Sequence, residues 1–326
     1  MSKTLSKVII RGVDGKSLLS RVQECMEFCE WQKWVQPGAL VAVKPNLCTA
    51  VREKCHMANT DPALVEAVCQ VLRTRTKRVV LVEADGLRQT AWEAFEASGY
   101  RRFTQELDLE FVNLSESPTV KTSLPPAGNI DLPEILLRAD AFITLPVLKT
   151  HALTYFTGAL KNQWGCLPQY DRILLHKYLD PMLVSLHSIL QPRMALMDGI
   201  IGMEGRGPTN GTPRRLDVVL ASQDSVALDV MAMRLVGLEP GRARHVVLTG
   251  EADLGQSQPA YIQVDGEWTR YQTQFEPAVL DKAIAAMNYM SRYRWFVKYA
   301  LEQNHVFYPV RSAVLFLRRF GLIEGG

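Results

Sequence analysis

The chain has 326 residues, of which 47% are hydrophobic and 22% are charged, and its formal net charge at pH 7 is +3. These values are ordinary for a globular protein with one large domain or two fused ones. The small excess of positive charge argues against a dedicated nucleic-acid-binding protein, because such proteins carry a stronger basic bias on one face. We therefore expect no nucleic-acid partner.

Six cysteines are scattered along the chain, and none forms a Cys-x-x-Cys pair. Zinc-ribbon and ferredoxin-type motifs are therefore absent, and no iron–sulfur cluster is expected. Scattered cysteines in a chain of this length are typical of a reducing compartment. Residues 1–15 lack the apolar core of a signal peptide, and no apolar run reaches the length of a membrane span. We expect a cytoplasmic protein.

The first part of the chain alternates apolar runs with amphipathic segments. We expect strands at Lys7–Val13, Ala39–Val43, Arg78–Val82 and Leu109–Leu114, and helices at Ser17–Trp31, Gln89–Ala97 and from Pro62 to about Arg75. Thr60 or Asp61 is the expected cap of the helix that begins at Pro62, because proline is tolerated in a first turn. The polar stretches Val51–Asn59 and Ser115–Asn129 are expected to be loops.

The same alternation continues in the second part. We expect strands at Ala141–Leu145, Arg193–Met197 and Leu216–Ala221, and helices at Pro133–Arg138, His176–Leu190 and Asp224–Val236. The glycine-rich stretch Asp198–Pro213 is expected to be a loop. Strands that alternate with helices predict an α/β fold, in which a mostly parallel sheet is covered by helices on both faces.

The character of the sequence changes after about Pro240. Asp265-Gly266 is a hairpin signal, and residues 278–320 have a helical pattern rich in aromatic and basic residues. We expect residues 1–239 to form an α/β core domain and residues 240–326 to form a hairpin and a helical extension packed on that core. For the basic aromatic tail, a helical cap or a homodimer contact is favoured over contact with a membrane surface.

Polar residues follow several of the expected strands. These stretches are Lys44–Asn46, Glu83–Gly86, Pro146–His151, Asp198-Gly199 and Ser222–Asp224. In open parallel sheets, ligands bind in the crevice beyond the carboxyl ends of the strands. We therefore expect these stretches to converge on one polar site.

Lysines are the most informative side chains of this expected site. A lysine ammonium suits a carboxylate or a phosphate, and a desolvated lysine can act as a base or nucleophile. Histidine can act as a general acid or base. The candidate catalytic residues are Lys149, His151, Lys161 and Asp198, and the candidate substrate-binding residues are Lys44, Asn46, Thr150, Asn162, Gly205 and Gly207. The alternative is a solvated lysine at a strand end and a structural histidine.

The stretch DGIIGMEGRGPTNG, which begins at Asp198, holds five glycines. Glycines let backbone N–H groups approach an anion, although tight surface turns explain them equally well. The stretch is neither Gly-x-Gly-x-x-Gly nor a Walker loop, so the sequence has no NAD or ATP fingerprint. A divalent metal is a further option, for which the candidate ligands are the carboxylates of Glu83, Asp85 and Glu204.

Several short motifs occur together in a fixed order. They are KPN at Lys44, TDP at Thr60, SGY at Ser98, LPVLKTH at Leu145, ALKNQWG at Ala159, the glycine-rich stretch at Asp198 and ASQDSVALD at Ala221. Together they resemble the domain-of-unknown-function family 362 over roughly Val41 to Gly237. Many members of that family resemble iron–sulfur proteins because a ferredoxin-like module is attached, and this chain lacks the cysteine runs of that module.

Two classes of function follow from these residues. The first is an enzyme that acts on a small anionic molecule by lysine and histidine acid–base chemistry, with or without a metal. Isomerisation, epimerisation and elimination next to a carboxylate are the expected reactions, and they are favoured over redox chemistry. The alternative is a non-catalytic protein that binds or carries a metal or a cofactor.

Overall fold

The computed structural model describes residues 5–13, 17–87, 89–279 and 282–301. Its strands are β1 (Ser6–Gly12), β2 (Val41–Pro45), β3 (Val79–Glu83), β4 (Glu110–Asn113), β5 (Thr119–Ser123), β6 (Asn129–Pro133), β7 (Ala141–Leu145), β8 (Val147–His151), β9 (Tyr155–Thr157), β10 (Met194–Glu204), β11 (Thr212–Ser222) and β12 (Ile262–Asp265).

The α-helices are α1 (Leu18–Phe28), α2 (Arg52–Ala58), α3 (Pro62–Arg73), α4 (Ala91–Ala97), α5 (Arg101–Glu106), α6 (Glu134–Arg138), α7 (Ala159–Asn162), α8 (Leu179–Leu190), α9 (Ser225–Leu235), α10 (Arg244–Glu251), α11 (Lys282–Met290) and α12 (Arg294–Phe296). Short 3-10 helices are η1 (Trp31–Lys33), η2 (Gln163–Cys166), η3 (Arg172–Tyr178), η4 (Pro240–Arg242), η5 (Pro259–Tyr261) and η6 (Trp268–Tyr271), and η7 (Val297–Leu301) is a π-helical turn. No helix in these ranges is long and apolar enough to cross a membrane.

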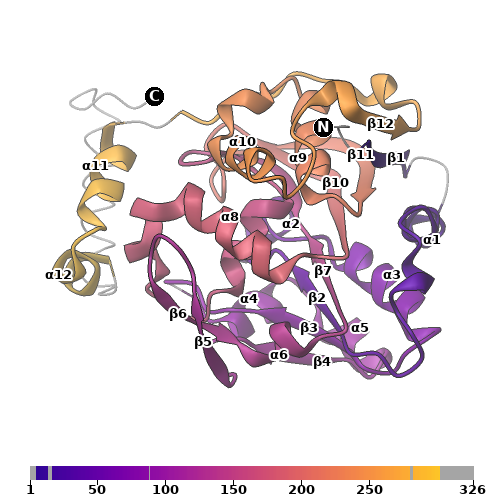
Figure 1. Cartoon of the computed structure of the whole chain (residues 1–326), viewed down its shortest axis with the longest axis horizontal. Helices are drawn as coiled ribbons and strands as arrows, with labels where there is room; N and C mark the ends of the chain where they lie inside the picture. Colours follow the sequence, from indigo (N-terminus) through magenta and orange to yellow (C-terminus); the bar gives the residue numbers. More distant parts are fainter. Residues whose placement is uncertain (1–4, 14–16, 88, 280–281, 302–326) are drawn as a thin grey trace.

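The main sheet has the strand order β12-β1-β11-β10-β7-β2-β3-β4, and Figure 1 labels these strands. In addition, β8 pairs with β10, and β9 pairs with β8. The strands from β10 through β7, β2 and β3 to β4 pair in parallel, whereas β11 is antiparallel to both β10 and β1. The fold is therefore a mostly parallel mixed sheet flanked by helices, and the α/β prediction is confirmed.

Helices cover both faces of this sheet. Along β2, Val41 and Val43 pack in a core cluster with residues of α1, α3 and α4, whereas Ala42 packs with residues of α8. Successive side chains of a strand point to opposite faces, so this alternation places α3 and α8 on opposite sides. A third cluster joins α9 and α10 to β1, β10 and β11. The sheet is buried between these layers, which leaves its carboxyl edge for polar residues.

Helix starts follow the sequence signals. The Asp61 carboxylate accepts a hydrogen bond from the N–H of Ala63 at the start of α3, and Asp224 accepts from Val226 and Ala227 at the start of α9. Such caps satisfy N–H groups that the helix itself leaves without partners. These two predicted starts are confirmed.

The sequence led us to expect a loop throughout Asp198–Pro213, but only residues 205–211 lie outside the strands. β10 continues to Glu204 and pairs with β11 in a long antiparallel hairpin. A Cβ at Gly199 would lie 2.8 Å from Val218 Cγ2, and a Cβ at Gly202 would lie 2.9 Å from the carbonyl oxygen of Leu148. These glycines therefore allow close packing against β11 and β8. They give the stretch the glycine-rich composition of a loop although part of it is a strand.

Two other expected loops are also ordered. Residues 51–59 contain α2, and residues 115–129 contain β5, which pairs with β6 in a small separate sheet. α2 has no side-chain cap, so its sequence carries no start signal. It brings the carbonyl oxygen of Ala58 to Lys149.

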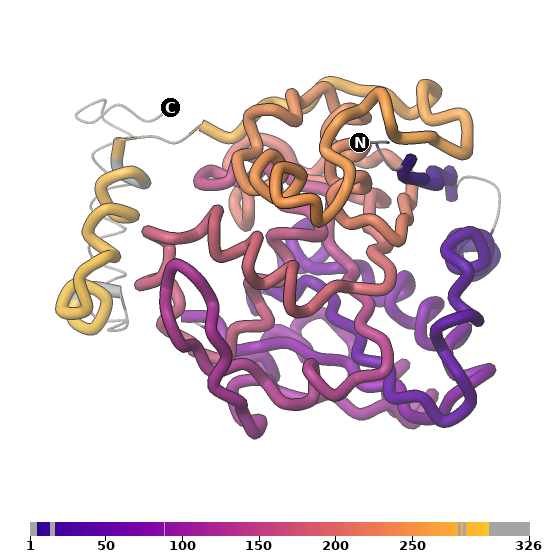
Figure 2. The backbone as a smooth tube through the Cα atoms, viewed as in Figure 1, coloured from indigo at the N-terminus to yellow at the C-terminus, as the bar shows by residue number. Residues whose placement is uncertain are grey.

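The hairpin expected at Asp265-Gly266 does not form, because β12 pairs in parallel with β1. Figure 2 shows this pairing as the orange segment of β12 beside the indigo N-terminal strand. A Cβ at Gly266 would lie 2.3 Å from the carbonyl oxygen of Ile10, so the glycine is required by close approach to β1. α11 and α12 lie at the left edge of Figure 1, and Arg294 contacts Asp171 beside η3 at 4.0 Å. Residues 302–320 of the expected helical tail lie outside the described residues.

Candidate functional site

A cavity of about 190 Å³ lies at the carboxyl ends of β2 and β3, beside β8, α7 and η3. It is smaller than the roughly 300–1,000 Å³ of sites for drug-sized ligands, so it suits a small molecule. Its lining residues are Lys44, Asn46, Leu47, Cys48, Glu83, Gly86, Gln89, Lys149, His151, Thr157, Lys161, Asn162, Trp164, Gly165, Arg172 and Pro208. The structure thus brings the three predicted lysines and His151 to one place.

Lys44 and Glu83 form a buried ion pair in the wall of the cavity. The Lys44 Nζ donates to Glu83 Oε2 at 2.9 Å, to the carbonyl oxygen of Pro45 at 3.0 Å and to Asn162 Oδ1 at 3.3 Å. The Glu83 carboxylate also accepts from the N–H groups of Leu47 and Ala84. All three N–H donors of this ammonium have acceptors, and its charge is balanced by Glu83. Lys44 therefore stabilises the fold and has no donor left for a ligand.

Gly165 explains part of the ALKNQWG motif. A Cβ at this position would lie 2.5 Å from Glu83 Oε1 and 2.7 Å from Lys44 Nζ. Distances under 3.0 Å do not occur for real Cβ atoms, so a side chain here would displace the ion pair. Gly165 therefore lets the chain pass directly over the pair.

Lys149 projects from β8 and is fully buried. Its Nζ donates to the carbonyl oxygen of Ala58 at 2.7 Å and lies 3.2 Å from Cys48 Sγ. No carboxylate among the described residues forms an ion pair with it within 4.0 Å. The buried ammonium of Lys149 therefore lacks the carboxylate partner that Lys44 has in Glu83.

Lys161 is held at the cavity by the anchoring of α7. Asp229, inside α9, accepts hydrogen bonds from the N–H of Ala159 at 2.7 Å and of Leu160 at 3.1 Å. A Cβ at Gly158 would lie 2.0 Å from Asp229 Oδ1, so the close approach of α7 to this carboxylate requires glycine. The buried Asp229 carboxylate thus fixes the short helix that carries Lys161.

The Lys161 ammonium has no hydrogen-bond or ion-pair partner in the described ranges, and it lies over the Trp164 ring, whose centroid is 5.6 Å away. Burial, together with the positive charges of Arg172, Lys149 and Lys44, lowers the pKa of Lys161 from its ordinary value to about 7. The crowding of like charges shows that the cavity holds an excess of positive charge.

Arg172, at the start of η3, is a cavity residue that the sequence did not reveal. Its Nη1 donates to the carbonyl oxygens of Asp85, Leu167 and Gln169. These bonds anchor one nitrogen, while the side chain as a whole lines the cavity. Burial lowers the pKa of this guanidinium. Arginine is suited to bidentate recognition of carboxylate and phosphate.

His151 is the last residue of β8, and one of its ring nitrogens accepts hydrogen bonds from the backbone. Its Nδ1 accepts from the N–H groups of Leu153 at 3.1 Å and Thr154 at 3.2 Å. Burial lowers the pKa of His151 well below its ordinary value, and the charge of Lys161 lowers it further. His151 is therefore neutral with its proton on Nε2, which makes it a hydrogen-bond donor. Because Nδ1 is engaged by these two N–H groups, the ring group that His151 can offer to a guest is the Nε2–H.

Asp198 does not line the cavity. It lies within β10, where its carboxylate accepts from the N–H of Asp61 at 2.7 Å and of Ile200 at 3.0 Å. Burial raises the pKa of Asp198 to about 7. Its contacts tie β10 to the start of α3, so Asp198 has a structural role at this position.

The predicted substrate-binding residues divide into two groups. Asn46 and Asn162 line the cavity, and their amides donate to Ala58 and to Thr144. Thr150 donates to the carbonyl oxygen of Gly205 at 3.0 Å, away from the cavity. The N–H of Gly205 donates to the carbonyl oxygen of Glu276.

Gly207 belongs to the second group. A Cβ at Gly207 would lie 1.9 Å from the carbonyl oxygen of Thr150, and its N–H donates to Gly205. The Gly205 and Gly207 N–H groups are thus engaged within the protein, because the β10–β11 hairpin folds against β8.

The three candidate metal ligands each have a partner within the protein. Glu83 is paired with Lys44, Asp85 accepts from Asn113 and from the N–H of Ala91, and Glu204 pairs with Arg214. Within the described ranges, no three His, Cys, Asp or Glu side chains are grouped so that they could hold a metal ion.

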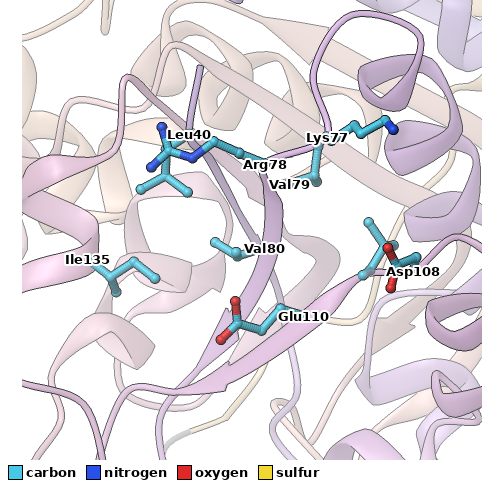
Figure 3. Close-up of a pocket in the computed structure, with 9 residues that line it drawn as sticks. Leu40, Lys77, Arg78, Val79, Val80, Asp108, Glu110 and Ile135 are labelled. Atoms are coloured by element: carbon cyan, nitrogen blue, oxygen red, sulfur yellow. The ribbon is translucent and has the colours of Figure 1, made fainter. Parts of the chain in front are cut away.

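A second cavity, of about 450 Å³, lies at the amino ends of β3 and β4. Figure 3 shows Lys77, Arg78, Asp108 and Glu110 among the residues around it, with Ile135 at one side. Its lining has two cationic and two anionic side chains, so their formal charges cancel. This cavity is larger, but it lies at the end of the sheet where α/β proteins seldom bind ligands.

Sequence reasoning missed Cys48, Gln89 and Arg172 as cavity residues. Cys48 follows the KPN motif by two positions, so its closeness to Asn46 was the available signal. Arg172 lies in a short 3-10 helix that follows irregular chain, and no periodicity marks it. Its position depends on how η3 folds back over the strand ends.

Comparison with known proteins gives relatives of modest similarity. Thylakoid-associated protein sll1697 from Synechocystis sp. (strain ATCC 27184 / PCC 6803 / Kazusa) is 29% identical over 248 residues, which are 74% of this chain and 76% of that protein. The lactate racemase apoprotein from Thermoanaerobacterium thermosaccharolyticum aligns with a TM-score of 0.45 and 12% identity, over 68% of this chain and 55% of that chain. A protein from Thermotoga maritima aligns with a TM-score of 0.38 and 11% identity, over 74% of this chain and 60% of that chain. The alignments span less than two thirds of either solved chain.

The family assignment comes from the sequence. The model of the family described as "Domain of unknown function (DUF362)" matches residues 41–234. This range runs from β2 into α9 and includes the lysines, Cys48 and Arg172 of the cavity. Because the match takes in more than half of the chain, the protein belongs to the DUF362 family.

Proposed function

We propose that the protein is an enzyme that binds a small carboxylate or phosphate in the cavity at the carboxyl ends of β2 and β3. One observation carries the proposal. Among the described residues that line the cavity, Lys149, Lys161 and Arg172 have no carboxylate partner, because Glu83 is already paired with Lys44. Lys149 is fully buried, and Lys161 and Arg172 are half-buried. Uncompensated charge away from water is costly, and an anionic guest would relieve that cost.

Lys161 is the proposed proton-transfer group. A pKa of about 7 leaves part of this lysine neutral near pH 7, which is the state that a general base requires. Lys149, Arg172 and the Nε2–H of His151 would bind the anionic group of the substrate. Proton abstraction from the carbon next to a carboxylate, as in isomerisation, epimerisation or elimination, suits this arrangement.

Binding is the first test of this proposal. We expect Lys161→Met to weaken the binding of small hydroxy- and keto-carboxylates about tenfold or more, because a charged hydrogen-bond donor is lost. Isothermal calorimetry with a panel of these acids and inorganic phosphate measures the effect. Lys177→Met is the matched control, because Lys177 is exposed on η3, and its affinities should stay unchanged. Equal affinities in the wild type and Lys161→Met would refute the proposal.

Catalysis is tested separately from binding. In D₂O, the wild type should exchange the proton on the carbon next to the carboxylate of a bound acid, and proton NMR follows the loss of that signal. Lys161→Met should abolish the exchange. Binding that depends on Lys161 without any exchange would favour the alternative, a non-catalytic binding protein.

A further inference from the structure

Cys48 places a thiol in the same cavity as the unpaired lysines. Its N–H donates to Asn59 Oδ1 at 2.8 Å, and its carbonyl oxygen accepts from Gln89 Nε2 at 2.8 Å. These backbone contacts fix the residue on both sides. The side chain lines the cavity and is partly accessible, so a small molecule in the cavity can reach it.

Lys149 is the charged partner of this thiol. Its Nζ lies 3.2 Å from Cys48 Sγ, and it has no ion-pair partner in the part of the chain that the structure describes. A cation next to a cysteine stabilises the thiolate, which is the nucleophilic form. A thiolate on Cys48 would in turn supply the counter-ion that the fully buried Lys149 lacks.

The other five cysteines lie in different surroundings. All of them are buried, whereas Cys48 is partly accessible. Burial raises the pKa of Cys25 and of Cys166 to about 12, and it also raises the pKa of Cys29, Cys55 and Cys69. A buried thiol with a raised pKa is inert, so any reactive thiol of this chain is expected at position 48.

We propose that Cys48 is a nucleophilic thiol, activated by Lys149, that reacts with small anionic electrophiles in the cavity. The preference for an anionic reagent rests on the proposed function, whereas the activation by Lys149 does not. In alkylation by a haloacetate, the Sγ–C bond forms as the C–halogen bond breaks. The halide leaves with the bonding electrons, and the thiol proton passes to water.

Alkylation of the full-length protein tests this proposal. The protein is treated at pH 7 with iodoacetate or iodoacetamide, and peptide mass spectrometry gives the rate at each cysteine. We expect Cys48 to react about tenfold faster than each of the other five, because only its thiol is accessible and next to a cation. Iodoacetate should be favoured over iodoacetamide at Cys48 more strongly than at the thiol of N-acetylcysteine.

Two variants separate activation from simple exposure. Lys149→Met should slow the reaction of Cys48 with both reagents about tenfold, whereas Lys149→Arg should retain most of the rate because it keeps the charge. Circular dichroism and thermal melting show whether each variant is folded. If Lys149→Met does not fold, a Lys149→Arg protein whose Cys48 is as inert as the buried cysteines overturns the proposal.

Other outcomes decide between this inference and the proposed function. Equal rates at all six cysteines, or an unchanged rate in a folded Lys149→Met protein, overturn the inference. Carboxylate binding that depends on Lys161, together with an inert Cys48, overturns the inference alone and leaves the proposed function standing. Fast alkylation of Cys48 without any preference for iodoacetate overturns the anionic part of the inference and counts against the proposed function.

Discussion

Lys44 and Lys161 reach the same cavity from different elements and meet opposite surroundings. The Lys44 Nζ has three acceptors, including the carboxylate of Glu83 at 2.9 Å. The Lys161 ammonium has none in the described ranges and lies over the Trp164 ring. A lysine whose donors are all used stabilises the fold, whereas a lysine without partners remains available to a guest.

The difference arises from the neighbours that the fold supplies to each lysine. β2 and β3 are paired in parallel, so the ends of both strands meet and Lys44 finds Glu83. α7 brings Lys161 towards Lys149 and Arg172, which lower its pKa. The cavity wall is therefore neutral on one side and positive on the other.

Removing Lys44 should cost the most stability. Lys44→Met leaves the buried Glu83 carboxylate without its counter-ion, and loss of one partner of a buried pair costs about 3–5 kcal/mol. Chemical denaturation followed by circular dichroism measures the free energy of unfolding. Lys161→Met is the matched variant, and it should cost no stability because this ammonium has no partner to lose.

A double variant sharpens the first prediction. Lys44→Met with Glu83→Gln removes both charges, so it should recover part of the stability lost in Lys44→Met alone. An equal loss of unfolding free energy in Lys44→Met and Lys161→Met would show that the two lysines contribute equally to stability.

Asp229→Asn should have a smaller effect, and it should lower both the stability of the fold and the affinity for a carboxylate. The carboxylate accepts from two N–H groups at the start of α7, and an asparagine offers only one oxygen. We expect a loss of about 1–3 kcal/mol, because a buried N–H is left without its acceptor. Carboxylate affinity should also fall, because α7 carries Lys161. Thermal melting and calorimetry measure the two effects, and unchanged affinity in a destabilised protein would show that α7 is not held by Asp229 alone.

The sequence was sufficient to predict that the lysines meet. Apolar runs that end at polar residues indicate parallel strands, and the carboxyl ends of such strands lie at one edge of the sheet. That reasoning located Lys44, Lys149 and His151 correctly, because it depends only on strand direction. It did not reveal which lysine is neutralised, because Glu83 is 39 positions from Lys44 and their pairing depends on strand order.

The glycine-rich stretch misled the sequence analysis for a physical reason. Glycine is used both where a loop turns and where another backbone passes closely, and composition does not separate the two. At Gly207, a Cβ would lie 1.9 Å from the carbonyl oxygen of Thr150, so the neighbour is β8 and not a ligand. Cys48 was missed because a lone cysteine becomes informative only when its distance to Lys149 is known.

The pH dependence of binding gives the finest test of the positive side of the cavity. Lys161 has a pKa of about 7 in the free protein, and a bound carboxylate would raise that pKa by favouring the charged form. Between pH 7 and the raised pKa, the free lysine is neutral and the bound one is protonated. Each binding event therefore takes up one proton, and affinity should fall by up to about tenfold per pH unit above pH 7. Below pH 7 both states are protonated, so affinity should be independent of this group.

Calorimetry in buffers of different ionisation enthalpy measures the proton uptake, and a carboxylic acid is used because phosphate itself titrates in this range. Lys161→Met should abolish the uptake, and uptake that persists in this variant would assign the titration to another group of the cavity.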